Sequence, residues 1–138
     1  MPYAGDVDPA SAYRVLAERP DAVLVDVRTS AEWSWVGGPD LAALGKPVVQ
    51  IEWVRFPGGV RNEAFVQELA AAGVPQDATV LFLCRSGVRS IAAAEAATAA
   101  GWTGAHNVLE GFEGNPDGTG HRGTTGGWKV AGLPWKQS

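Results

Sequence analysis

A chain of 138 residues, 46% of them hydrophobic, can build one core of useful size, and we expect one domain over residues 1–138. The formal net charge of -4 and the pI near 5.1 argue against a nucleic-acid or anionic-membrane partner. No apolar stretch approaches the roughly 20 residues that cross a bilayer, and the N-terminus has no basic segment followed by an apolar one. We therefore expect a cytoplasmic protein.

The first half of the chain predicts one helix and two strands. Asp8 suits an N-cap, Pro9 suits the first helical position, and Pro20 ends this helix. The β-branched apolar run at residues 23–27 predicts a strand buried on both faces, and residues 47–51 predict a second strand.

The second half continues the alternation of helices and strands. Asn62 is expected to cap a helix, and residues 79–84 predict the strand that follows it. Ser90 is expected to cap a helix over residues 91–100, and residues 106–109 predict a last short strand. This order predicts an α/β fold: three α/β/α layers with a small, mainly parallel central sheet.

Two stretches show no clear period and are predicted to be loops. Residues 33–46 carry two tryptophans among glycines, and residues 110–127 contain seven glycines. A long loop of the second kind in a compact domain is either functional or poorly ordered.

Cys84 is the clearest functional signal, because it is the chain's one cysteine and ends a predicted buried strand. A single thiol excludes an internal disulfide and a cysteine-rich metal site, which leaves inert packing or chemistry. Ligands of parallel sheets gather at the carboxyl ends of strands, and the loop amides and following helix there favour an anion. Arg85 and Arg89 add fixed positive charge, so we expect a thiolate that attracts anionic substrates.

At this point the sequence resembles the rhodanese family of sulfurtransferases. The segment CRSGVRS at residues 84–90 resembles the family's active-site loop, and Asp26, Arg28 and Glu32-Trp33 fall in a stretch similar to its Asp-Val-Arg…Glu-aromatic segment. Residues 107–112 resemble its Asn-Val-x-x-Gly-aromatic stretch. Trp128 and the later Gly-Leu-Pro resemble its C-terminal pattern.

The resemblance implies that Cys84 takes a sulfane sulfur from an anionic donor such as thiosulfate or a persulfide, and becomes a persulfide itself. It then passes the sulfur to cyanide or a thiol, which makes the chain a rhodanese-type thiosulfate sulfurtransferase that needs no metal or organic cofactor. With no second cysteine to resolve the persulfide, the acceptor must come from outside the chain, and a sulfur-relay protein is a candidate partner.

The resemblance also assigns roles to the site residues. Backbone amides of the loop would hold the persulfide, and Arg89 would tie the loop to the fold with Asp26 as its candidate carboxylate partner; Arg28 is a further supporting residue. Arg85, beside the nucleophile, would contact the donor anion. The loop residues assigned to this site are Arg85, Ser86, Gly87, Val88, Arg89 and Ser90.

Two other functions remain open. Related phosphatases and arsenate reductases on the same fold place five residues between the cysteine and the arginine, whereas four lie between Cys84 and Arg89. A tighter ring suits one sulfur atom better than a phosphate. The second alternative is a persulfide carrier or partner-docking module with little turnover.

The chain departs from the family pattern at two places. Residues 35–39 (WVGGP) replace the usual His-Ile-Pro-Gly-Ala-like turn, and the glycine-rich residues 118–123 are unusual. We hypothesise that this second stretch folds over the pocket mouth as a lid, in which His121 or Arg122 helps to hold a substrate anion. The alternative is a solvated surface loop.

Overall fold

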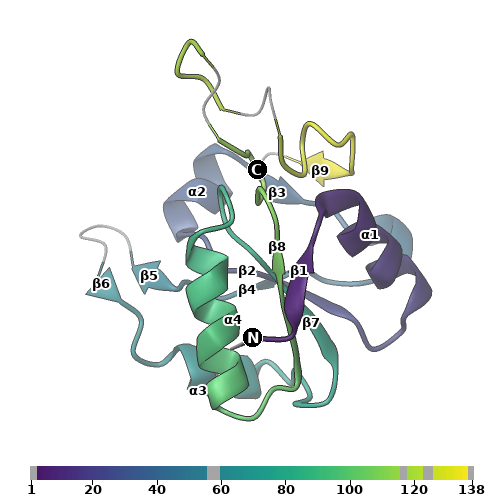
Figure 1. The fold of residues 1–138 in the computed structure, drawn as a ribbon, viewed down its shortest axis with the longest axis vertical. Coiled ribbons are helices and arrows are strands. Elements are labelled where there is room, and N and C mark those ends of the chain that lie inside the picture. The colour runs from purple at the N-terminus through teal and green to yellow at the C-terminus, as the bar shows by residue number, and fades with distance from the viewer. Residues whose placement is uncertain (1–2, 56–59, 116–117, 123–125, 137–138) are drawn as a thin grey trace.

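The computed structural model describes residues 3–55, 60–115, 118–122 and 126–136, and its centre is a five-stranded parallel sheet (Figure 1). The order of the strands is β1-β8-β7-β2-β4. Their bounds are β1 Gly5–Val7, β2 Val23–Asp26, β4 Val49–Gln50, β7 Thr79–Leu83 and β8 Gly104–Val108.

Helices cover both faces of this sheet, which confirms the predicted α/β fold with a mainly parallel sheet. Helices α3 (Phe65–Ala71) and α4 (Arg89–Ala99) pack on the face that carries Val25 and Phe82, and α1 (Pro9–Glu18) packs on the other. Successive strand side chains point to opposite faces, so Leu24 and Leu81 lie in the hydrophobic cluster on the face that α1 covers. Each such large apolar side chain stabilises the fold by about 1.5–3 kcal/mol on burial.

One predicted cap is confirmed and two are wrong. The Asp8 carboxylate accepts a hydrogen bond of 2.7 Å from the Ser11 amide at the start of α1. The α3 helix starts three residues after Asn62, whose side chain is buried and accepts from the Ala64 amide. Ser90 lies inside the first turn of α4, where its hydroxyl points inward and bonds Asn107 instead of capping.

The stretch predicted as a loop over residues 33–46 is partly regular. It contains the end of α2 (Ser30–Trp35), the short strand β3 (Gly38–Pro39) and the 3-10 turn η1 (Ala42–Leu44). Thr29 and Glu32 form a reciprocal capping box that starts α2. Strand β3 pairs antiparallel with β9 (Trp135–Lys136), so this region is held by a partner from the far end of the chain.

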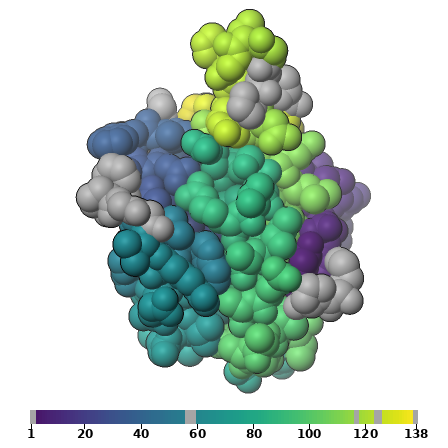
Figure 2. Space-filling model, turned by 60° about the vertical axis from the view of Figure 1, so that its left-hand side comes forward, coloured from purple at the N-terminus to yellow at the C-terminus, as the bar shows by residue number. Residues whose placement is uncertain are grey.

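Two smaller features project from the body of the molecule. Strands β5 (Val54–Arg55) and β6 (Val60–Arg61) pair antiparallel beside α2 and α3 (Figure 1). Residues 118–122 project from the top of the molecule in the space-filling view (Figure 2). Among the residues described, we find no helix of the length and apolar character that a membrane span requires.

Candidate active site

Cys84 follows β7, the middle strand of the sheet, and is the first residue of the segment over residues 84–90, here called the cysteine loop, whose last two residues begin α4. Strand β7 lies between β8 and β2, and the loop leads directly into α4. The predicted strand-loop-helix order around the thiol is therefore present. The carboxyl ends of three neighbouring parallel strands surround the loop.

The sulfur of Cys84 has polar partners although it lies inside the protein. The Gly87 N–H donates to Sγ at 3.0 Å, and the Ser90 Oγ lies 3.3 Å from Sγ. Cys84 is 1% exposed and also contacts the apolar cluster beneath α3 and α4. The position is that of a core cysteine, yet a backbone donor and a hydroxyl face its sulfur, which inert packing does not require.

A second backbone segment packs directly against the cysteine loop. The Phe112 N–H donates to the Cys84 carbonyl at 2.8 Å, and the Glu113 and Gly114 amides donate to the Arg85 carbonyl. Gly111, at φ 60°, sits so close that a Cβ there would collide with the Cys84 carbonyl oxygen. This close approach explains the glycine that follows β8.

Arg89 fixes the end of the cysteine loop through Glu32 of α2. Its Nη1 and Nη2 donate to Oε1 and Oε2 at 2.8 and 3.0 Å, and both side chains are mostly buried. A planar guanidinium on both oxygens of one carboxylate is a strong, directional pairing. The expected partner Asp26 was wrong, because that carboxylate is already bound to Arg28 on its own segment.

The contact between Arg89 and Glu32 shifts the pKa of both side chains. Burial opposes ionisation of the Glu32 carboxyl, but hydrogen bonds from Arg89 and the Thr29 amide outweigh it and hold the pKa below its ordinary value of 4.5. Burial likewise opposes the charge of Arg89, and its bond to Glu32 outweighs that and raises its pKa. Both groups therefore keep their charges at neutral pH.

Asp26 and Arg28 form a second, fully buried pair beside β2. The Arg28 Nε and Nη2 donate to the Asp26 carboxylate, with the shortest contact at 2.7 Å, and Nη2 also donates to the Gly37 carbonyl. The guanidinium carbon lies 4.5 Å from the centre of the Phe112 ring. The pair thus ties β2 to the chain before β3 and to the segment that supports the cysteine loop.

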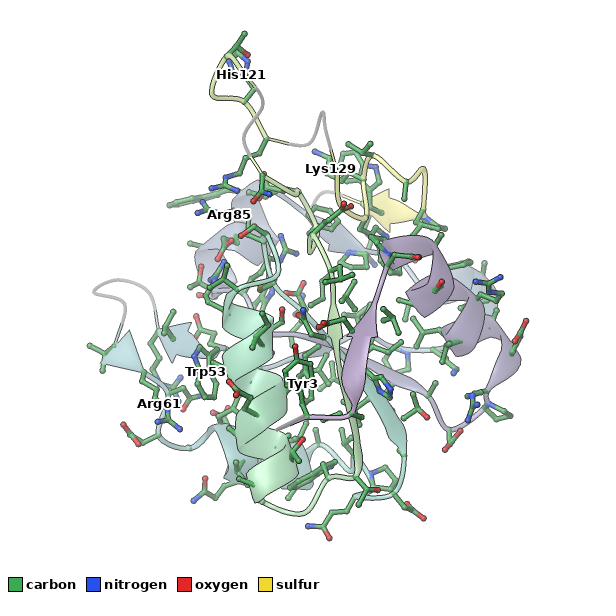
Figure 3. All side chains as sticks on the ribbon, in the orientation of Figure 1. Tyr3, Trp53, Arg61, Arg85, His121 and Lys129 are labelled. Atoms are coloured by element: carbon green, nitrogen blue, oxygen red, sulfur yellow. The ribbon has the colours of Figure 1, made fainter. Side chains whose placement is uncertain are left out.

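The outer part of the cysteine loop is exposed. Arg85 and Val88 are both exposed, and Val88 keeps 71% of its surface open to solvent. Figure 3 shows Arg85 at the carboxyl edge of the sheet, above α4. A charged side chain here is available to an anion, and contact with the donor stays a prediction.

The two lid residues lie in different surroundings. His121 is exposed at the tip of the projecting loop, away from Arg85 (Figure 3), and its Nδ1 lies 3.0 Å from the Thr119 hydroxyl. Arg122 Nη1 donates to the Gly114 carbonyl at 2.7 Å, so it braces the segment behind the cysteine loop. That either residue holds a substrate anion stays a prediction.

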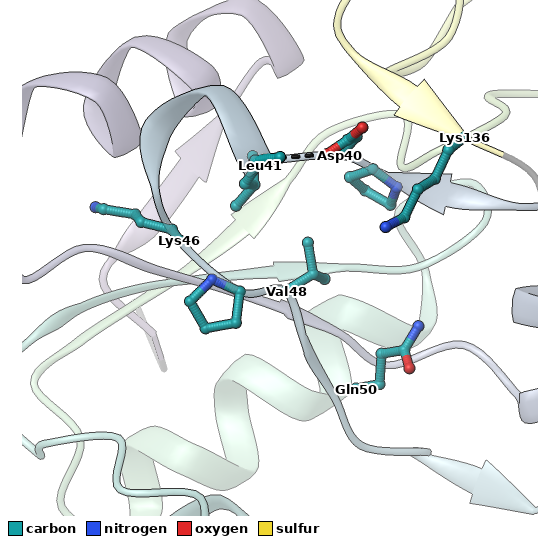
Figure 4. A pocket seen from close by; sticks show the side chains of 9 residues that line it. Asp40, Leu41, Lys46, Val48, Gln50 and Lys136 are labelled. Atoms are coloured by element: carbon teal, nitrogen blue, oxygen red, sulfur yellow. Dashed lines mark hydrogen bonds between the residues drawn. The ribbon is translucent and has the colours of Figure 1, made fainter.

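A cavity of about 270 Å³ lies away from the thiol, at the β4 edge of the sheet (Figure 4). The Lys136 side chain points toward it from β9, whereas the Lys46 amine bonds the Arg19 and Ala22 carbonyls. Residues of the cysteine loop are not among those that line this cavity.

Three site residues were not assigned from sequence: Glu32, Asn107 and Gly111. All three fall in segments that resembled the family pattern, and Glu32 carried a further signal in the Thr29-x-x-Glu32 capping box. Their contacts join elements far apart in sequence, so a one-dimensional pattern gave no partner for any of them.

The geometry agrees with comparisons to known proteins. The chain is 32% identical over 135 residues to the chloroplastic protein named thylakoid rhodanese-like of Oryza sativa subsp. indica, a match covering 97% of this chain and 25% of that protein. The polysulfide-sulfur transferase homodimer of Wolinella succinogenes is 22% identical with a TM-score of 0.63, over 96% of this chain and 78% of that one. The fold is therefore rhodanese-like.

Closer matches cover nearly the whole chain. A crystal structure of Rv0390 from M. tuberculosis is 54% identical with a TM-score of 0.91, over 99% of each chain. The uncharacterized protein RC0915 of Rickettsia conorii is 37% identical over 126 residues, 91% of each chain. Residues 5–138 match the family model of the STR4 middle domain, and the chain belongs to this family.

Proposed function

We propose that the chain is a sulfurtransferase that carries a sulfane sulfur on Cys84. The observation that carries the proposal is the thiol at the carboxyl end of the middle strand, with the Gly87 N–H donating to Sγ at 3.0 Å. A backbone N–H at this place stabilises negative charge on sulfur, which both the attacking thiolate and the loaded persulfide carry.

The reaction balances as two displacements at sulfur. The Cys84 thiolate attacks the outer sulfur of thiosulfate, a new S–S bond forms, and sulfite leaves with the electron pair of the old one. An acceptor, cyanide or a thiolate, then attacks the terminal sulfur of the persulfide. The Cys84 thiolate leaves and is ready for the next donor.

Each charged group has a separate part in this scheme. Arg85 is exposed beside the nucleophile and would attract the donor's anionic group. Arg89, bound to Glu32, holds the start of α4 and so keeps the loop amides in place. Because Cys84 is 1% exposed, a donor reaches Sγ only when part of the surrounding structure moves.

The burial of the thiol favours a second candidate, a persulfide carrier that accepts sulfur from a partner protein and turns over small donors poorly. Both candidates use the same nucleophile and require an external acceptor, such as a thiol or a sulfur-relay protein. A phosphatase or arsenate reductase is disfavoured by the four-residue spacing between Cys84 and Arg89. A cytoplasmic location is part of the proposal.

Turnover of thiosulfate and cyanide by the purified protein tests the enzymatic proposal. Thiocyanate formation well above that of Cys84→Ser supports an enzyme. Stoichiometric loading of Cys84 without turnover supports the carrier. If neither turnover nor loading exceeds that of the variant, the proposed chemistry is wrong.

A further inference from the structure

A line of polar side chains runs from the buried thiol to the surface at β1. The Ser90 hydroxyl bonds the Asn107 Oδ1 at 2.5 Å, and the Asn107 Nδ2 donates to the Asp6 carboxylate at 3.1 Å. The Tyr3 hydroxyl donates to the same Asp6 oxygen at 2.9 Å. Ser90 and Asn107 are fully buried, whereas Asp6 is exposed.

The available hydrogens determine which group donates in each of these hydrogen bonds. A carboxylate accepts hydrogen bonds and cannot donate them, so the Asn107 amide must turn its NH₂ group toward Asp6. The carbonyl oxygen of Asn107 then faces Ser90 and can only accept. The single hydroxyl hydrogen of Ser90 is therefore given to Asn107.

This arrangement determines which atom of the Ser90 hydroxyl faces the sulfur. With its hydrogen committed to Asn107, the Ser90 oxygen presents a lone pair to Sγ at 3.3 Å. That lone pair favours the protonated thiol, which can donate an S–H bond, over the thiolate. To help a thiolate, Ser90 must turn its hydrogen to sulfur, which leaves the buried Asn107 oxygen unsatisfied.

We propose that Asp6 is a positioning residue which, through Asn107 and Ser90, restrains ionisation of the Cys84 thiol. This inference rests on the proposed function, since it concerns the state of that nucleophile. It assigns opposite effects to two parts of the site: the Gly87 N–H favours the thiolate, and the Ser90 oxygen favours the thiol.

Other charged groups lie around the cysteine loop. Arg89 of α4 is paired to Glu32 of α2, and Arg85 follows Cys84 directly in the chain. The Asp26–Arg28 pair lies on the neighbouring segment of β2. The variants chosen below leave all of these unchanged.

The experiment follows the ultraviolet absorbance of the thiolate against pH, with each variant repeated in a Cys84→Ser background as the blank. Asp6→Asn lets the Asn107 amide turn over and frees the Ser90 hydrogen for sulfur. We expect its thiolate fraction at neutral pH to rise by about threefold to tenfold, the range of one ordinary hydrogen bond. Asn107→Leu, which removes the acceptor, should raise it at least as much.

Three matched variants separate the inference from simpler causes. Asp6→Glu retains an acceptor and should restore the wild-type curve. Tyr3→Phe removes the other bond to Asp6 and should not move it. Glu95→Gln removes a nearby surface charge that interacts with Tyr3, outside the polar line, and should also leave the curve unchanged.

The outcomes separate the inference from the proposed function. The inference is wrong if the Asp6→Asn titration curve equals that of wild type, or if Glu95→Gln shifts the curve as far as Asp6→Asn does. Asp6 is exposed, so the Asp6→Asn variant should fold even if Asn107→Leu does not. The absorbance needs no sulfur donor. A displaced curve in a protein that never forms a persulfide would support the inference while contradicting sulfur transfer.

Discussion

The two arginine–carboxylate pairs near Cys84 differ in span and in burial. Arg28 and Asp26 are two residues apart and completely buried, whereas Arg89 and Glu32 join α4 to α2 and keep 25% and 18% of their side-chain surfaces exposed. The first pair fixes the end of one strand against the segments around it. The second fixes the cysteine loop against a different helix. Loss of the first pair should therefore mainly reduce stability, and loss of the second should also reduce sulfur loading.

Removing one member of the buried pair should cost the most stability. We expect Arg28→Met to lower the free energy of unfolding by about 3–5 kcal/mol, because it leaves the Asp26 carboxylate uncompensated in the interior. Urea denaturation gives the value. The double variant Asp26→Leu with Arg28→Met should lose less than Arg28→Met alone, and an equal or greater loss would contradict this reason.

Breaking the pair of Arg89 and Glu32 should lower stability less than breaking the buried pair, and should slow the loading of Cys84. We expect Glu32→Gln to lower the free energy of unfolding by about 1–3 kcal/mol, since water reaches the pair and charged hydrogen bonds are worth this much. The rate at which thiosulfate loads Cys84 should fall with it. Exposed Glu18 provides the control, since Glu18→Gln should change neither quantity.

Acid should weaken the pair of Arg89 and Glu32. The folded-state pKa of Glu32 lies below the ordinary 4.5, so its ionised form stabilises the fold above that value. This contribution should disappear as the pH falls from there through the lower folded-state pKa. The stability difference between wild type and Glu32→Gln, measured by denaturation against pH, should shrink over that range, and a constant difference would contradict the assignment.

Arg85, which belongs to neither pair, should have the smallest effect on stability. Arg85→Ala removes an exposed side chain and should change the free energy of unfolding by less than about 0.5 kcal/mol. Loading of Cys84 at low thiosulfate should slow, with little change at saturation. Equal slowing at all donor concentrations would place Arg85 in the chemical step instead of donor attraction.

The comparison of the two pairs also shows what the sequence could reveal. The cysteine loop, the strand before it and the α1 cap depend on neighbouring residues, and local patterns predicted all three. The partner of Arg89 lies 57 positions away in the chain, and no local pattern distinguishes Glu32 from Asp26 as that partner. Asp26 was the wrong choice because its carboxylate is already hydrogen-bonded to Arg28, two residues later in the chain.

Long-range contact also explains the elements that were missed or misassigned. Strands β3 and β9 are two residues long and pair across most of the chain, which no hydrophobic period signals. Ser90 looked like a helix cap because serine favours that role on exposed helix ends. In the fold its position is buried against β8, where Asn107 is the better partner.

Mass spectrometry of the Cys84 peptide after exposure to thiosulfate tests the central claim most directly. The account predicts the added mass of one sulfur atom on this peptide, its loss when cyanide or a thiol is added, and no addition in Cys84→Ser. A wild-type peptide that stays unmodified after prolonged exposure to thiosulfate and to a protein persulfide would contradict it.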